Sequence, residues 1–161
     1  MISVLNEGTR VEMLDIDPDQ FGLEQKLLVL VVEDDEDNLF LATQILSYLG
    51  CVCASTNNVQ IAVELSQRLK PALILLDLKL SGEDGLKVVR QLRLDPSTAA
   101  IAVIAVTAQV MPGHRERAIA AGCDDYLRKP YMLEELEAVV RQHLNLASPA
   151  TQISADVESL P

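Results

Sequence analysis

Four short runs of this sequence end in polar residues whose side chains suit one chemistry. These residues are Glu33-Asp34, Asp77, Thr107 and Lys129. Mg²⁺ takes oxygen ligands, and one or two carboxylates plus phosphate oxygens are enough to hold it. A carboxylate can also accept a phosphoryl group as a nucleophile, and a lysine with a hydroxyl can hold the oxygens of the transferred group. If these residues meet, they predict a magnesium and phosphoryl site.

Each residue taken alone has a plainer interpretation. Asp77 follows the apolar run 72–76, and a single acid in that place often caps a turn or a helix. The five consecutive acids 33–37 could form a solvated charged loop, although such a cluster is unfavourable unless water or a cation neutralises it. The interpretation therefore depends on whether the fold brings these run ends together.

The apolar runs alternate with segments of helical period, which predicts an α/β fold. The predicted strands are 27–32, 51–55, 72–76, 101–106 and 125–128, and the predicted helices are about 38–49, 59–69, 86–92, 112–121 and 133–144. Strands separated by helical crossovers form a parallel sheet with helices on both faces. The carboxyl ends of all five strands then lie at one edge, so the polar run ends can converge.

The first predicted helix carries more apolar residues than one face needs. We expect its core face to consist of Asn38, Leu41, Ala42, Ile45 and Leu49, with a stop at Gly50. Leu39, Phe40 and Leu46 lie off that face, and we expect them to be partly exposed and available to a partner helix.

Length and composition fit one domain with two tails. The chain has 161 residues, 49% hydrophobic content, a net charge of −11 and no apolar run near the length of a membrane span. The negative charge argues against direct binding of nucleic acid, and no secretory signal precedes the first strand. We expect residues 1–26 to be a loosely docked acidic extension with one short strand near 11–16, and residues 146–161 to be a disordered tail.

Three cysteines, Cys51, Cys53 and Cys123, show no metal-ligand spacing and are an odd number. We expect reduced, mostly buried thiols in a cytoplasmic protein. His114 and His143 fall on predicted helices away from the run ends, and we expect surface or packing roles for both.

Four motifs at these run ends resemble the receiver domain of two-component response regulators. The motifs are Val-Val-Glu-Asp-Asp, Leu-Leu-Asp-Leu-Lys-Leu-Ser-Gly-Glu-Asp-Gly, Val-Thr-Ala and Asp-Tyr-Leu-Arg-Lys-Pro, in this order. The resemblance covers about residues 27–145. It implies a flavodoxin-like (βα)5 fold, a doubly wound sheet with strand order 2-1-3-4-5. We expect no effector domain after residue 145, because the 16 remaining residues are too few to bury a core, so the chain resembles a stand-alone receiver.

The resemblance also implies roles for individual residues. Asp77 would be the phosphoacceptor, and Mg²⁺ would be held by Asp34, Asp77 and the backbone carbonyl of Lys79, with Glu33 acting through metal-bound water. The other implied roles are a hydroxyl switch at Thr107, a phosphoryl-binding cation at Lys129, an aromatic switch at Tyr126 and a cis peptide bond before Pro130. Asp35 would lie outside the metal shell as a solvated acid at a helix start. Two residues depart from the family pattern: Ser81 stands where many relatives have proline, and Lys79 places a cation two residues after the acceptor.

The implied partners are a sensor histidine kinase or a histidine phosphotransfer protein, which would dock on the first helix near Leu39 and Phe40. A downstream protein would bind the face formed by the fourth helix, the fifth strand and the fifth helix, around Arg115, Tyr126 and Glu137. The protein would be a monomer or a phosphorylation-linked dimer. It would catalyse only its own phosphorylation and dephosphorylation.

Three other functions are alternatives to this one. The chain could be a pseudo-receiver that binds partners without phosphorylation, although the complete set of site residues argues against that. A phosphatase of the haloacid dehalogenase kind would need an acid two residues after the nucleophile, where this chain has Lys79. Dinucleotide binding would need a glycine-rich motif after the first strand, and none is present.

Overall fold

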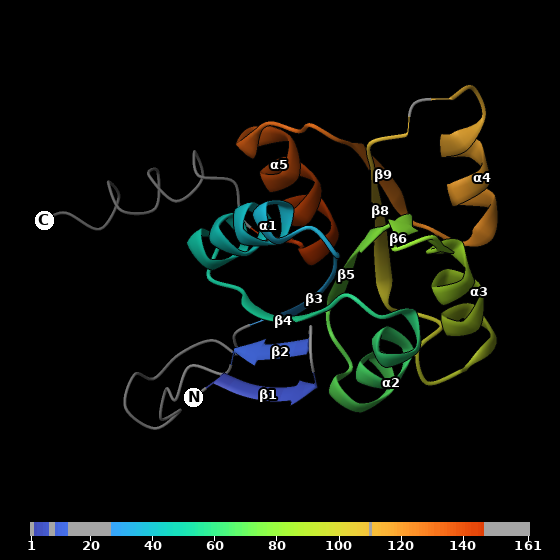
Figure 1. Ribbon diagram of the computed structural model, residues 1–161. Coiled ribbons are helices and arrows are strands. Elements are labelled where there is room, and N and C mark those ends of the chain that lie inside the picture. The colour runs from blue at the N-terminus through green and yellow to red at the C-terminus, as the bar shows by residue number, and fades with distance from the viewer. Residues whose placement is uncertain (1, 7–8, 13–26, 110, 147–161) are drawn as a thin grey trace, which may run out of the picture.

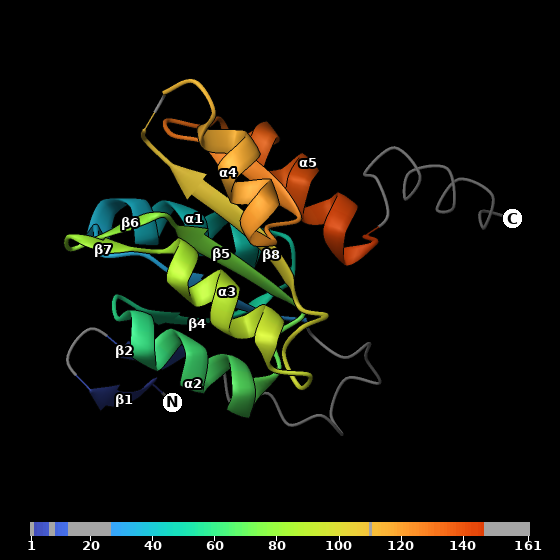
Figure 2. The same cartoon turned by 90° about the vertical axis from the view of Figure 1, so that its right-hand side faces the viewer.

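A parallel sheet covered by helices on both faces forms the body of the protein (Figure 1, Figure 2). The computed structural model describes residues 2–6, 9–12, 27–109 and 111–146. The parallel strands are β3 (Leu28–Val32), β4 (Val52–Thr56), β5 (Leu73–Asp77), β8 (Ala102–Thr107) and β9 (Asp125–Arg128). They lie in the order β4-β3-β5-β8-β9, all neighbours being parallel. In chain order of the parallel strands this is 2-1-3-4-5, so the predicted fold class is confirmed.

The five helices follow the strands as predicted. They are α1 (Glu36–Tyr48), α2 (Val59–Leu69), α3 (Leu86–Leu94), α4 (His114–Ala121) and α5 (Leu133–Leu144). Apolar residues alternate between the two faces of each strand, as the period of two requires. Leu30 and Val32 pack with α2 and α3 in one core cluster, whereas Val29 and Val31 pack with α1 and α5 in the other. This two-sided burial explains why the strands read as continuous apolar runs.

The core face of α1 differs from the predicted one at two positions. Leu46, predicted to be partly exposed, is fully buried, whereas Leu41, predicted to be in the core, is 45% exposed. Ala42, Ile45 and Leu46 pack against the sheet and α5. The helix is therefore rotated towards Leu46, because one apolar stripe must fill the space shared with both the sheet and α5. Phe40 is 65% exposed, as predicted.

A hairpin at the N-terminus extends the sheet, which the sequence analysis did not predict. Strands β1 (Ile2–Asn6) and β2 (Thr9–Glu12) are antiparallel, and β2 pairs antiparallel with β4. The sheet thus has seven strands in the order β1-β2-β4-β3-β5-β8-β9. Of the single strand expected near residues 11–16, residues 11 and 12 belong to β2 and the rest lie outside the described residues, as do residues 147–161 of the expected tail.

A second, very short hairpin follows Asp77. Strand β6 (Lys79–Leu80) pairs antiparallel with β7 (Glu83–Asp84), and a two-residue turn joins them. Ser81, Gly82 and Gly85 by their residue types predict only loop and turn here. Among the described helices, none is long and apolar enough to cross a membrane.

Candidate functional site

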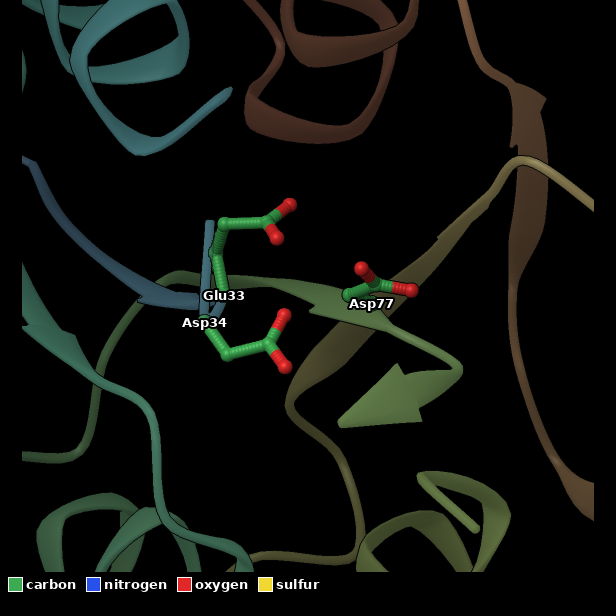
Figure 3. Close-up of side chains that lie close together, drawn as sticks. All are labelled: Glu33, Asp34 and Asp77. Atoms are coloured by element: carbon green, nitrogen blue, oxygen red, sulfur yellow. The ribbon is translucent and has the colours of Figure 1, made fainter. Parts of the chain in front are cut away.

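Three carboxylates converge at the carboxyl edge of the sheet. Glu33 and Asp34 follow β3, and Asp77 ends the neighbouring strand β5. One carboxylate oxygen from each residue lies within 4.8 Å of the others. Figure 3 shows Glu33 and Asp34 side by side, with their carboxylates on the side where Asp77 lies. The predicted convergence is therefore present in the structure.

Lys129 places a positive charge between two of these carboxylates, those of Glu33 and Asp77. Its Nζ donates to Asp77 Oδ2 at 2.9 Å and to Glu33 Oε2 at 2.5 Å. Its side chain is only 10% exposed. Burial alone would lower the pKa of Lys129, but the hydrogen bonds to the two carboxylates outweigh burial and raise its pKa above the ordinary value. Lys129 is therefore a fixed cation within reach of Asp77.

The three acids have different surroundings. Glu33 is 7% exposed, and burial raises the pKa of Glu33 more than the hydrogen bonds from Lys129 and the Asp35 amide lower it. Asp34 is exposed. Its burial is slight, and the hydrogen bonds from Ser81 outweigh it, so the pKa of Asp34 lies below its usual range. One ammonium is paired with two of the three carboxylates, so the cluster keeps a net negative charge that a further cation would neutralise.

The donor set fits Mg²⁺, which prefers oxygen ligands and tolerates few protein carboxylates. The exposed Asp34 leaves the cluster open to solvent on one side. Lys79 contributes its amide, which donates to Asp77 Oδ1 at 2.9 Å. Asp35 lies outside the cluster and caps α1, because its Oδ1 accepts from the Asn38 amide at 2.9 Å.

The backbone around Asp77 is closely packed on Gly85. A Cβ atom built on Gly85 would lie 2.6 Å from the Asp77 carbonyl oxygen and 2.9 Å from Leu78 Cα. The Gly85 amide also donates to the Leu78 carbonyl at 3.0 Å. Only glycine allows this approach, so Gly85 fixes the chain that follows the acceptor position. Residue type alone indicates only a turn at Gly85.

Thr107 and Tyr126 lie on the neighbouring strands β8 and β9. Thr107 is buried, and its Oγ1 accepts from the Gln109 amide at 3.2 Å. The Tyr126 hydroxyl donates to the Gln109 carbonyl at 3.1 Å. The Lys129 amide donates to the Thr107 carbonyl at 2.8 Å, and the Lys129–Pro130 peptide bond is cis. Gln109, which the sequence analysis did not single out, thus links the two residues with predicted switch roles.

The remaining predicted residues lie outside this cluster. His143 Nε2 is 3.0 Å from Asp125 Oδ2, a contact between α5 and β9. Burial would raise the pKa of Asp125, but the hydrogen bond to His143 and one from the Tyr126 amide bring it below the usual value. Cys51 and Cys123 are buried and none of the three cysteines is in a disulfide. Burial raises the pKa of Cys123 to about 11.

Comparison with known proteins agrees with this geometry. The family model described as "Response regulator receiver domain" matches residues 29–141. The polar-differentiation response regulator DivK of Brucella anthropi is 34% identical over 116 residues, which cover 72% of this chain and 94% of DivK. Hybrid signal transduction histidine kinase G of Dictyostelium discoideum is 32% identical over 123 residues, which cover 74% of this chain and 4% of the kinase.

Solved structures of receiver domains are also similar. One is the receiver domain of sensor histidine kinase PA1611 from Pseudomonas aeruginosa with a magnesium ion coordinated in the active site cleft. It has 29% identity and a TM-score of 0.69, and the match covers 75% of this chain and 99% of that one. The signal receiver domain of a putative LuxO repressor protein from Vibrio parahaemolyticus has 26% identity and a TM-score of 0.69, with 84% and 100% covered. The chain therefore belongs to the receiver domain family of response regulators.

Proposed function

We propose that this protein is a single-domain response regulator that accepts a phosphoryl group on Asp77 and signals by binding another protein. The donor is a sensor histidine kinase or a histidine phosphotransfer protein in the cytoplasm. One observation carries the proposal: Lys129 holds Asp77 Oδ2 at 2.9 Å beside two further carboxylates. This arrangement places a nucleophile, a cation and hard oxygen ligands within one small space.

Glu33, Asp34, Asp77 and the Lys79 carbonyl are the groups that would hold Mg²⁺. A magnesium ion held by these groups would supply positive charge to offset that of the phosphoryl oxygens. The magnesium ion in the PA1611 receiver domain supports this assignment. Glu33 is suited to a role through water, because its Oε2 is already hydrogen-bonded to Lys129.

The remaining residues position the phosphoryl group. Asp77 attacks phosphorus, a P–N bond to the donor histidine breaks and an O–P bond to Asp77 forms. The Lys129 ammonium then turns from the Asp77 carboxylate to the phosphoryl oxygens, which keeps the buried charge paired. The Thr107 hydroxyl lies at the end of the adjacent strand and can exchange its bond with Gln109 for one to the phosphoryl group. The protein catalyses no reaction except the gain and loss of this group.

The signal leaves through the face of α4, β9 and α5. Tyr126 lies on β9, half-buried, and can follow Thr107 inwards. This is a two-state rearrangement, and phosphorylation shifts it by binding one state better. Residues 27–145 act as the receiver unit, residues 1–26 as an acidic extension and residues 146–161 as a tail. The phosphorylated protein is a monomer or a dimer.

Phosphorylation of the Asp77→Asn variant tests this function. Asparagine keeps the shape of the side chain but removes the nucleophilic charge. With acetyl phosphate and Mg²⁺, intact-mass spectrometry of the unchanged protein should show a gain of about 80 Da, one phosphoryl group, and the variant should show none. Asp37→Asn, an exposed acid on α1, is the matched control and should react normally. An unphosphorylated wild-type protein that still binds its partner would indicate a pseudo-receiver instead.

A further inference from the structure

The short hairpin after Asp77 has a turn that presents a single side chain to the site. Strands β6 and β7 are joined by Ser81 and Gly82, which have φ values of +43° and +85°. Two central residues with positive φ define the type I′ turn, the usual two-residue connection of a β-hairpin. Gly82 suits this turn. Ser81 does not, because a non-glycine residue rarely adopts positive φ.

The unfavourable backbone of Ser81 coincides with two hydrogen bonds to a site residue. The Ser81 amide donates to Asp34 Oδ2 at 2.8 Å, and the Ser81 hydroxyl donates to the same oxygen at 3.0 Å. Asp34 is 47 residues earlier in the sequence, on the loop after β3. A glycine or an asparagine would form the same turn with less strain. The serine hydroxyl is therefore better explained by its contact with Asp34 than by the turn.

The two bonds leave Asp34 able to bind a cation. Both end on Oδ2, and a carboxylate offers about four lone-pair sites in total. The bonds fix the rotation of the carboxylate, and one oxygen of Asp34 remains within 4.8 Å of the oxygens of Glu33 and Asp77. In Figure 3 the strand that follows Asp77 runs towards the Asp34 side of the cluster. Ser81, in the hairpin after β5, thus links that segment to the loop after β3, which contains Asp34.

We propose that Ser81 is a positioning residue for the metal, and this inference rests on the Mg²⁺ site of the proposed function. Its hydroxyl holds Asp34 in the orientation that ligates the ion, so the Asp34 side chain loses less conformational entropy when the ion binds. Groups that orient metal ligands in this way commonly change metal affinity by 10- to 100-fold when they are removed, as an order of magnitude. Because Ser81 and Asp34 are both exposed, the lower end of that range applies. By thermodynamic linkage, the factor by which the contact between Ser81 and Asp34 raises the affinity for Mg²⁺ equals the factor by which bound Mg²⁺ favours that contact.

The Ser81→Gly variant isolates the hydroxyl. Glycine keeps the amide donor and accepts positive φ, so the hairpin should form and the metal-free protein should be at least as stable. We expect the dissociation constant for Mg²⁺ to rise about tenfold, measured by isothermal titration or by amide shifts in nuclear magnetic resonance spectra. Ser97→Gly, at the other end of α3, removes an exposed serine hydroxyl far from the site and should leave the dissociation constant unchanged.

Hydrogen exchange at the Ser81 amide gives a second measurement. In the unchanged protein, Mg²⁺ should slow exchange of this amide, and Asp34→Ala should speed its exchange in the absence of metal. An Mg²⁺ dissociation constant that stays within twofold in Ser81→Gly, or becomes lower, would overturn the proposal. If Asp77 of that variant is still phosphorylated at saturating Mg²⁺, the proposed function stands and only the role of Ser81 fails. If the unchanged protein does not bind Mg²⁺, the metal site of the proposed function is itself contradicted.

Discussion

The Tyr126 hydroxyl donates a hydrogen bond to the backbone carbonyl of Gln109 at 3.1 Å, across the gap between β9 and the loop after β8. The amide of the same residue, Gln109, donates to Thr107 Oγ1 at 3.2 Å. The backbone of Gln109 is therefore hydrogen-bonded to both the buried Thr107 hydroxyl and the Tyr126 side chain. If Thr107 turns towards a phosphoryl group, the Gln109 amide loses its acceptor, and the loop is released on the side where Tyr126 is bonded.

The first prediction concerns this link. Tyr126→Ala removes both the ring and the hydrogen bond to Gln109. Phosphorylation of Asp77 should then no longer change the conformation of the α4-β9-α5 face. We expect phosphorylation from acetyl phosphate to stay within about twofold of the unchanged protein, because the charged groups of the site are untouched. Phosphorylation-dependent binding of the partner should be lost, as measured by pull-down with and without phosphorylation. The reverse result, loss of phosphotransfer with intact binding, would show that Tyr126 serves the donor.

The second prediction concerns Phe40 on α1. Its ring is 65% exposed beside the acidic loop, whereas the core of α1 is formed by Ala42, Ile45 and Leu46. Phe40→Ala should therefore leave stability unchanged within about 0.5 kcal/mol. It should slow phosphotransfer from a histidine donor about tenfold while leaving acetyl phosphate, which needs no docking, as effective as before. Equal slowing with both donors would place Phe40 outside the docking surface.

The third prediction concerns the metal. An ion that binds only the folded state stabilises it by about 1.4 kcal/mol at ten times its dissociation constant. Mg²⁺ should thus raise the unfolding temperature of the unchanged protein, and Asp34→Ala should abolish most of that rise. Asp37→Ala removes an acid from α1 outside the cluster and should keep the full response. A response that survives in Asp34→Ala would place the ion elsewhere.

The fourth prediction uses the raised pKa of Glu33, whose main cause is burial. A carboxyl group whose pKa is raised by folding makes its full contribution to stability below its unfolded-state pKa, which is 4.5 for Glu33. That contribution is lost as the pH rises through the folded-state pKa. Glu33→Gln removes this loss because the amide stays neutral. Without metal, the variant should be more stable than the unchanged protein at pH 7 and no more stable at pH 4. Urea unfolding at both pH values measures the difference, and a gain that persists at pH 4 would exclude ionisation as its cause.

The fifth prediction concerns Arg93 at the end of α3. Its guanidinium donates hydrogen bonds to the Asp124 carboxylate and to the backbone carbonyls of Ala99, Ile101 and Gly122. Arg93→Met keeps the aliphatic stem but leaves these acceptors without their donor, which should cost about 3 kcal/mol of unfolding free energy. Arg90→Met, an exposed change on the same helix, should cost less than about 0.5 kcal/mol. Similar losses in both variants would show that helix charge, rather than this set of bonds, matters.

The parts of the fold that repeat a local pattern could be predicted from sequence. The three central strands β3, β5 and β8 are buried on both faces, so residues such as Leu73–Leu76 mark their strand without knowledge of the partners. The face of α1 could not be predicted, because Leu41 and Leu46 both fit a helical stripe with Ala42 and Ile45. Only packing against α5 decides between them. The pairing of β2 with β4 could not be predicted either, because the residues of a strand do not name its partner.

The candidate site likewise has residues that could be predicted from sequence and residues that could not. Glu33, Asp34, Asp77 and Lys129 could be found because their strands end at one edge, which topology alone guarantees. Ser81 reaches Asp34 from a backbone with positive φ, and Gln109 contacts Thr107 and Tyr126 through its backbone groups. Neither the backbone conformation nor these backbone contacts can be predicted from residue type. The Leu-Ser-Gly-Glu stretch of the hairpin was a weak signal, because a residue followed by glycine between short extended segments can form a type I′ turn.

The pairing of β2 with β4 also decides where the sheet can grow. Without β1 and β2, strand β4 would be an outermost strand, with backbone donors and acceptors at Ala54, Ser55 and Thr56 open to any extended chain. Such an edge is a template for strand addition, by a peptide or by another copy of the protein. Here residues 9–11 already fill it. Residues 9–11, which lie outside the segment matched by the family model, therefore move the outermost position on this side of the sheet from β4 to β1.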